Sequence, residues 1–388
     1  MVARIKVEQK IFEWATQQTD KSFDDIDNKF PKFEEWVTGE IQPTLNQLIE
    51  FSSFTKIPFG YLVLKDPPTE TLPLLEFRTV DTEEILNPSR ELLDTIKDME
   101  KKQEWMREYL IDEGYSKNDI VKSIHFSNEL KIKNTSNYIK EKIGITDDWY
   151  KNSNTRNDSF NYLKQVLSDN GILVMQNGTA LGNTHRPLNI NEFRAFALVD
   201  DYAPLIFINT QDTQNGKVFS ILHELTHIFL GVDSLYNKDF YKRNKYANKL
   251  EVLCNAVAAE IAVPIEEFQL EWKNVRTEDI YQKVSIISDK FKISSIVIAR
   301  KALDTELIAK EIYYQIAKKV QEDANKINST KSGGNAIHTA QSRLDKKFVY
   351  ALSNSLDRGY AVYTDIYKLT GLSRNVFEKV EKNVMGRK

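Results

Sequence analysis

The clearest hydrophobic periodicity in the chain lies at residues 218–231, where apolar residues recur at helical spacing. On a helical wheel centred on Leu225, the other apolar residues of this run fall within roughly 60° of the centre; they are Val218, Ile221, Leu222, Ile228 and Phe229. Gly231 follows the last periodic residue and predicts the end of the helix. An apolar run at 204–208 with turn and capping residues at 209–215 precedes it. The pattern therefore predicts a strand, a loop and a helix in succession.

The neighbouring segments extend this pattern on both sides. A helix is predicted at 159–168 and a strand at 172–175, and runs at 193–199 and 204–208 predict a hairpin turning at 200–203. A helical run from residue 250 stops at Pro264, and further helices are predicted at 278–290, 294–303 and 306 to about 324. These elements predict an α+β class that is mostly helical, with a small antiparallel or mixed sheet.

The two ends of the chain are predicted to be helical. Short helices are expected at 11–16, 23–29, 33–38 and 44–55, and Pro67 and Pro68 predict an extended linker at 66–73. The charge-rich segment 81–142 indicates two long helices, most simply a solvated connecting hairpin. Residues 339–381 are again helical, after a polar boundary at 328–335.

The resulting domain organisation has five parts. They are a helical domain at 1–70, a helical connector at 71–146, a core at 147–270, a helical domain at 271–328 and a C-terminal helical domain at 336–388.

Composition narrows the function classes. The 53 basic and 56 acidic residues nearly balance, so no overall electrostatic field favours binding to nucleic acid or to an anionic membrane. The N-terminus lacks the apolar core of a signal peptide, and no stretch approaches about 18 apolar residues. The single cysteine, Cys254, excludes an intramolecular disulfide and suits a reducing compartment. We therefore expect a cytoplasmic protein without a membrane role, and a core position for Cys254 in preference to a metal or redox role.

The helix at 218–231 carries an H-E-x-x-H motif formed by His223, Glu224 and His227. A helix turns about 100° per residue, so the two histidines lie about 40° apart and one turn apart along the axis. Two imidazoles so placed can share a zinc ion. Glu224 lies where a carboxylate could act as general base on a water without coordinating the metal. The motif also occurs by chance in unrelated helices, so it needs support from its context.

A catalytic zinc normally takes three protein ligands, and Glu251 is the best candidate for the third. Asn255 lies one turn from Glu251 on the same face, so it can hydrogen-bond one of the metal ligands without binding the metal itself. Glu260 falls on the opposite face of the same predicted helix.

These residues together resemble the ImmA/IrrE family of zinc metallopeptidases. The resemblance rests on the motif at 223–227, the glutamate–asparagine pair at 251 and 255, the stop at Pro264, and residues 193–197 with the 204 strand; it covers roughly 160–310. It implies a zincin-like core flanked by helical domains, with zinc on His223, His227 and Glu251 and with Glu224 as base. Val257 and Cys254 depart from the family's usual phenylalanine and alanine, at packing positions.

Residues 36–62 resemble the XRE-type helix-turn-helix often fused ahead of such peptidases, a motif whose third helix would contact DNA. That helix would span 30–36. Residues 1–70 hold 8 basic and 12 acidic residues, a net charge of about −4, whereas a DNA-binding face is normally basic. The composition therefore disfavours DNA and favours a protein-binding role.

Several other residues are weaker candidates. Tyr236, Tyr241 and Tyr246 could stabilise an oxyanion. His185 and Arg194 could contact substrate, although a surface role is the simpler interpretation. Arg300 and Lys301 could touch nucleic acid, but solvated side chains on an exposed helix are the simpler interpretation.

We conclude from the sequence that the chain is a zinc-dependent endopeptidase. The family resemblance implies limited cleavage of a regulatory protein, such as a co-encoded helix-turn-helix repressor of a mobile element or stress locus. The alternative is an antitoxin-like binding module that pairs with a toxin, with proteolysis secondary or lost. Glu224 argues against that alternative, because a structural scaffold does not need it.

Overall fold

The structure is a computed structural model of the 388-residue chain. It describes residues 4–19, 21–68, 88–127, 129–236, 245–327 and 335–386. The chain divides into two compact units, Met1–Lys97 and Asp98–Lys388, which are considered separately below.

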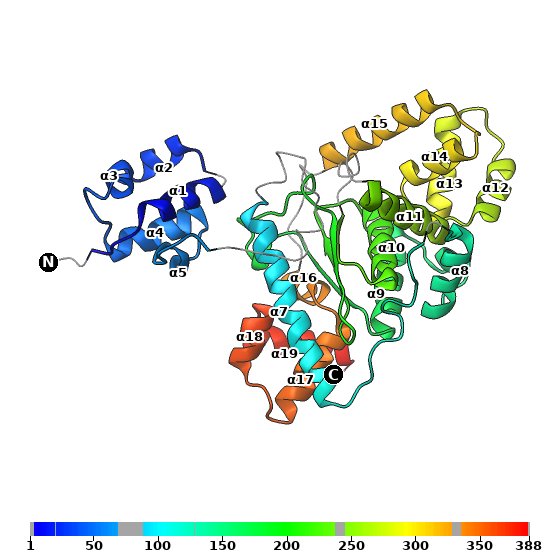
Figure 1. Ribbon diagram of the computed structural model, residues 1–388. Helices are drawn as coiled ribbons and strands as arrows, with labels where there is room; N and C mark the ends of the chain where they lie inside the picture. Colours follow the sequence, from blue (N-terminus) through cyan, green and yellow to red (C-terminus); the bar gives the residue numbers. More distant parts are fainter. Residues whose placement is uncertain are drawn as a thin grey trace. The chain divides into compact units, whose positions relative to one another are not determined.

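The first unit is a set of short helices around an aromatic core (Figure 1). Its helices are α1 (Gln9–Gln18), α2 (Phe23–Lys29), α3 (Phe33–Val37), α4 (Leu45–Thr55) and α5 (Phe59–Leu62). The rings of Phe12, Phe33, Trp36 and Phe51 contact one another in edge and stacked arrangements. Ser22 and Thr44 begin α2 and α4 with capping boxes. The four predicted helices are confirmed, and the one-turn α5 was not predicted.

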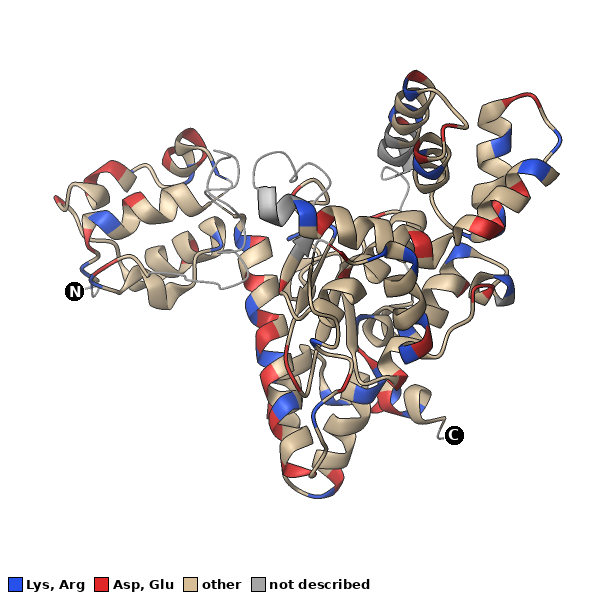
Figure 2. Ribbon diagram, turned by 45° about the vertical axis from the view of Figure 1, so that its right-hand side comes forward, with Lys and Arg blue, Asp and Glu red and all other residues tan. Residues whose placement is uncertain are grey.

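The surface of these helices is acidic along α2 and α3 (Figure 2). Asp24, Asp25, Asp27 and Glu34 are all exposed there. The helix that would contact DNA is shorter than the predicted span of 30–36, because α3 holds only five residues. Its first turn carries Glu34 and Glu35, which would repel phosphate.

The second unit contains a four-stranded mixed sheet. Its strands are β1 (Leu173–Asn177), β2 (Ala195–Leu198), β3 (Leu205–Asn209) and β4 (Ser234–Tyr236), in the order β1-β3-β2-β4. β1 runs parallel to β3, whereas β2 is antiparallel to both β3 and β4. The predicted hairpin between β2 and β3 is confirmed, and the mostly helical chain with a small sheet agrees with the predicted α+β class. The edge strand β4 was not predicted.

Helices α9 (Arg156–Asp169) and α10 (Gln214–Leu230) pack together against this sheet (Figure 1). The strands β1, β2 and β3 are buried on both faces over nearly their whole length, so they form apolar runs without alternation. α11 (Lys245–Ala262) lies against α10. Both helices that carry the predicted ligands are therefore part of the main core.

The solvated connecting hairpin predicted at 81–142 is not what forms in the described part of this segment. α7 (Arg90–Asp112) is a long helix along which acidic and basic residues are interleaved (Figure 2). α8 (Ile132–Ile143), by contrast, packs against α11, and Ile139 and Ile143 belong to the main core. Their spacing of four residues creates one apolar stripe, which the neighbouring helix buries. The core thus includes residues that we had placed in the connector at 71–146.

The chain after α11 consists of helices. They are α12 (Ile265–Asn274), α13 (Ile280–Phe291), α14 (Ser295–Asp304), α15 (Lys310–Ile327), α16 (Ala336–Arg343), α17 (Lys346–Asp357), α18 (Tyr363–Thr370) and α19 (Arg374–Met385). α12 was not predicted; it begins directly after Pro264, which occupies its N-cap position. Two shorter 3-10 segments, η2 (Trp149–Asn152) and η3 (Ala180–Gly182), complete the described elements.

The C-terminal helices are attached to the sheet by a buried carboxylate. Asp345 is fully buried and accepts hydrogen bonds from Ser168 Oγ at 2.9 Å and from the Val174 backbone N–H at 3.1 Å. Phe348 packs edge-on against Trp105 of α7, with ring centres 5.6 Å apart. Helices from opposite ends of the second unit therefore meet beside β1.

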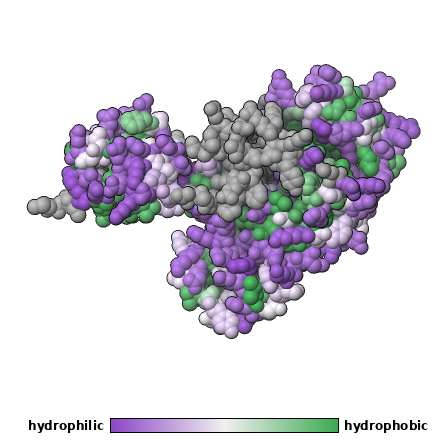
Figure 3. Space-filling model, in the orientation of Figure 1, coloured by the Kyte–Doolittle hydropathy of each residue, from purple (hydrophilic) through white to green (hydrophobic). Residues whose placement is uncertain are grey.

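The surface shown in Figure 3 is mostly polar, with apolar areas separated by polar residues. None of the helices in the described ranges combines the length and the apolar character that crossing a bilayer would require.

Candidate metal centre

The sequence around α10 fixes both ends of the helix that carries the two histidines. The Thr213 side chain accepts a hydrogen bond from the Gly216 N–H and begins the helix, and Gly231 ends it with a left-handed φ of 70°. The segment before α8 also covers the C-terminal end of α10, because the backbone N–H groups of Lys122 and Ile124 donate hydrogen bonds to the last carbonyls of that helix. His223 and His227 are thereby held in register, and both are fully buried.

The two imidazoles converge on one point. Their Nε2 atoms are 3.2 Å apart, as the spacing of four residues predicts. α11 brings Glu251 to the same point, with its carboxylate oxygens 3.2 Å from His223 Nε2 and 3.3 Å from His227 Nε2. Among the described residues, no other group of histidine, cysteine, aspartate or glutamate side chains is placed to hold a metal ion.

The donor set and its spacing fit zinc. Bonds of roughly 2.0–2.1 Å arranged tetrahedrally would place neighbouring ligand atoms about 3.3 Å apart. The two Nε2 atoms are about this far from each other, and each is about this far from its nearer Glu251 oxygen. Two buried imidazole nitrogens and a carboxylate concentrate lone pairs in one place, and a cation would balance them. Zinc favours imidazole and carboxylate ligands and leaves one tetrahedral position open when three protein ligands are present.

Electrostatics favour the metal-binding protonation states of His223 and Glu251. At His227, by contrast, burial is outweighed by Cys254 and Glu251, which raise the pKa, so without a metal this imidazole favours its protonated form. Burial lowers the pKa of His223, which favours the neutral imidazole. Burial alone would raise the pKa of Glu251, but the imidazoles of His227 and His223 hold that pKa well below its usual range. A neutral imidazole and an ionised carboxylate are the forms in which these groups act as ligands.

Glu224 lies beside the cluster without belonging to it. Its side chain is fully buried, and burial raises its pKa to about 8. Its Oε2 accepts a hydrogen bond from the hydroxyl of Ser234, and its Oε1 has no hydrogen-bond partner within the described part of the chain. A buried carboxylate with one oxygen held and the other available can accept a proton from a water at the centre.

Comparison with known proteins agrees with this geometry. Residues 168–303 match the family model of the IrrE N-terminal-like domain, Peptidase_M78. The match runs from the end of α9 to α14 and includes β1 to β4 and both ligand-bearing helices. No curated protein and no solved structure matches the chain. For this segment, the family model supports the resemblance to ImmA/IrrE proteins and a metallopeptidase-like domain.

Beside the three candidate ligands, α11 contributes two further side chains. Asn255 lies one turn beyond Glu251 on α11, and its side chain is near enough to His223 to oppose the lowering of that imidazole's pKa by burial. Its predicted hydrogen bond to a ligand stays a prediction. Cys254 is fully buried in the main core and lies beside His227. Burial raises the pKa of the Cys254 thiol, so it favours the neutral form expected of a small core residue.

The far end of α11 is fixed by a buried ion pair that the sequence did not reveal. Lys301 Nζ lies 2.7 Å from a Glu260 carboxylate oxygen and also donates to the Val263 carbonyl. The second Glu260 oxygen accepts from the Ile265 N–H at the start of α12, at 3.0 Å. The prediction of a solvated Lys301 is therefore wrong, because α14 packs this side chain against the end of α11 instead of exposing it. Arg300 does remain at the surface, paired with Asp304.

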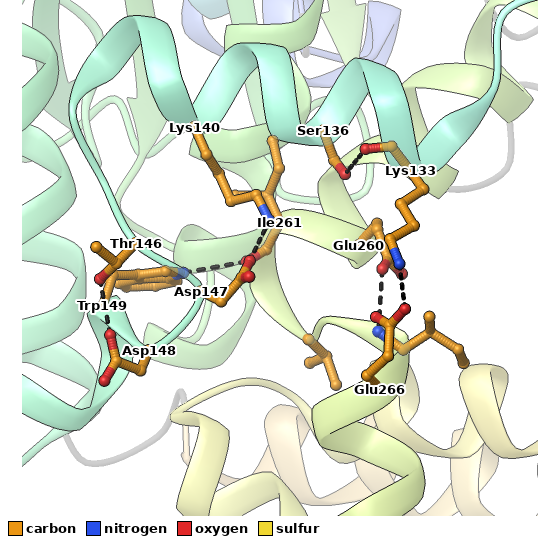
Figure 4. A network of polar contacts seen from close by, with 12 residues as sticks. Lys133, Ser136, Lys140, Thr146, Asp147, Asp148, Trp149, Glu260, Ile261 and Glu266 are labelled. Carbon is orange, nitrogen blue, oxygen red and sulfur yellow. Dashed lines mark hydrogen bonds and ion pairs between the residues drawn. The ribbon is translucent and has the colours of Figure 1, made fainter.

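Polar contacts of α8 and η2 surround the junction between α11 and α12 (Figure 4). The Trp149 indole N–H donates to the Ile261 carbonyl at 3.0 Å, and Lys133 of α8 pairs with Glu266. Lys140 of α8 pairs with Asp147 in the turn before Trp149. Of these contacts, the one from Trp149 reaches α11 itself, whereas the two lysines tie α8 to α12 and to the turn before η2.

Two other candidates, Arg194 and His185, are not part of the cluster. Arg194 is bound to the buried carboxylate of Asp212 at 2.6 Å, a contact that ties β2 to the turn before α10. His185 lies in an exposed loop. The side chains of Tyr236 and Tyr246 and the whole of Tyr241 lie outside the described residues.

No sequence pattern pointed to a role for Ser234. A three-residue strand is too short to show a period of two, and an isolated serine carries no motif.

Proposed function

We propose that the chain is a zinc-dependent endopeptidase. The observation that carries this proposal is the convergence of His223, His227 and Glu251 at zinc-ligand spacing, beside a buried Glu224 that does not join them. The family model over residues 168–303 supports the same chemistry.

The proposed roles in peptide hydrolysis differ between the three ligands and Glu224. The three ligands would hold zinc, which supplies Lewis acidity toward water and a peptide carbonyl. Glu224 would take a proton from the attacking water with Oε1 and later deliver it to the leaving amine. Because His223 and Glu224 are fully buried, bulk water would not screen these charges.

Metal content tests the ligand assignment. Purified wild-type chain should carry about one zinc per chain by mass spectrometry. Glu251→Gln should lose it, whereas Glu224→Gln should keep it, because only the first residue belongs to the cluster. A wild-type chain that takes up no zinc even after supplementation would refute the proposal and favour a binding module that has lost its metal.

We further propose that the substrate is a regulatory protein, such as a helix-turn-helix repressor encoded beside the gene. This proposal rests on the resemblance to ImmA/IrrE proteins. The zinc-loaded chain should cut such a repressor at one or a few sites, and Glu224→Gln should leave it intact. If the wild type leaves every neighbouring regulator uncut while it hydrolyses other proteins, the substrate assignment is wrong.

A further inference from the structure

The edge strand β4 presents a hydroxyl to the residue that we assign as general base. Ser234 is the first residue of β4 and is 4% exposed, and Glu224 is 0% exposed. The Ser234 hydroxyl donates a hydrogen bond to Glu224 Oε2. Because both groups are buried, water does not compete strongly for this contact.

We propose that Ser234 is a positioning residue for Glu224, holding Oε2 so that Oε1 is the oxygen that meets the water. This inference rests on the proposed peptidase function. A carboxylate whose two oxygens are equivalent can rotate about its terminal torsion, which is broad and roughly two-fold. One strong donor on Oε2 breaks that equivalence, and Oε1 then has no partner within the described residues.

The backbone around Ser234 is tightly fixed. The turn between α10 and β4 is closed by hydrogen bonds from the Gly231 N–H to Ile228 and from the Val232 N–H to His227. The carboxylate of Asp233 accepts the Val199 N–H, and Ser234 pairs with Ala197 of β2. The Ser234 Cα is therefore held from both the helix and the sheet.

This arrangement connects the edge of the sheet to the base. A displacement of β4 would carry the Ser234 hydroxyl with it and would release Glu224 Oε2. The hydrogen bond also offsets part of the cost of burying an ionised carboxylate.

Ser220 offers a matched control. It lies on α10 close to His223, it is 1% exposed, and its hydroxyl has no hydrogen-bond partner within the described residues. Ser220→Ala therefore removes a comparably buried hydroxyl that makes no hydrogen bond to Glu224.

A double-mutant cycle on the full chain tests the contact without reference to activity. Unfolding in urea is measured for the wild type, Ser234→Ala, Glu224→Ala and the double variant. We expect the effects on the unfolding equilibrium constant to be non-additive by about tenfold, the usual coupling of a hydrogen bond to a charged group. Ser220→Ala should combine additively with Glu224→Ala. Additive effects for Ser234 would overturn the proposal.

Kinetics then separate positioning from a purely structural role. Ser234→Ala should lower kcat about tenfold to a hundredfold with little change in KM, because Glu224 acts in the transition state and not in substrate binding. Ser234→Thr keeps a hydroxyl and should restore most of the rate, and Ser220→Ala should match the wild type. An unchanged kcat in Ser234→Ala, with an active wild type, refutes the role of Ser234 alone. A zinc-loaded wild type that cleaves nothing refutes the proposed function together with that role.

Discussion

Replacement of Gly231 by alanine should destabilise the second unit strongly. Gly231 ends α10 with a φ of 70°, and a Cβ built there would lie 2.1 Å from Lys122 Cγ and 3.0 Å from Lys122 Cβ. Lys122 cannot easily withdraw, because its own backbone has a positive φ of 58° and its N–H bonds the Ile228 carbonyl at 3.2 Å.

The magnitude has two parts. A left-handed conformation costs a residue with a Cβ about 1–2 kcal/mol. Forcing an extra methyl into a packed site costs about 1–3 kcal/mol more. The free energy of unfolding should therefore fall by about 2–5 kcal/mol in Gly231→Ala.

Gly359 provides the control for urea denaturation of the full chain. It has a similar φ of 73°, but a Cβ there would meet nothing within 4 Å. Gly359→Ala should thus lower the free energy of unfolding only by the cost of the left-handed backbone conformation, about 1–2 kcal/mol. Lys122→Gly should recover most of the excess in the Gly231 variant. If Gly231→Ala costs no more than Gly359→Ala, the contact with Lys122 does not constrain the end of α10 and the reasoning fails.

Three further predictions concern stability, pH and metal. Lys301→Ala should lower the free energy of unfolding by about 3–5 kcal/mol, because it leaves the buried Glu260 carboxylate without its cationic partner. Arg300→Ala removes an exposed ion pair and should lower it by less than about 1 kcal/mol. Equal effects of the two variants in urea denaturation would contradict the buried pairing. Burial lowers the pKa of Lys164 from 10.5 to about 8, so the unfolded chain binds the extra proton in that interval and stability should rise with pH across it. Lys164→Met should reduce this rise in denaturation curves, and an identical slope would argue against the lowered pKa. Zinc at about a hundred times its Kd should add about 2.7 kcal/mol to the wild type and to Glu224→Gln; calorimetry showing an equal rise in Glu251→Gln would remove that residue from the ligand set.

The helix at the centre of the second unit was predictable because its information is local. The period of the apolar residues, the capping Thr213 and the terminal Gly231 all lie within or beside α10. The ligand positions follow from the same helical geometry, and Glu251 could be proposed because α11 shows a comparable pattern and a stop at Pro264.

The missed features depend on contacts between distant segments. The apolar stripe of α8 shows which side is buried but not what buries it, so its place in the core required α11. Lys301 looks like an ordinary charged helix residue until Glu260, 41 positions earlier, is brought beside it. Ser234 likewise acquires a partner only when β4 returns next to α10.

The attachment of the C-terminal helices to β1 limits how the sheet can associate with other chains. α16 lies beside β1, the outward Val174 N–H is taken by Asp345, and the Gln176 side chain donates to the Ser342 carbonyl. In the described sheet this leaves β4 as the other terminal strand. Edge-to-edge pairing needs a free row of backbone groups on both partners, and growth into a fibre needs two such rows on each molecule. With the β1 side occupied, two copies that paired through β4 would form a closed dimer and could not continue as a polymer.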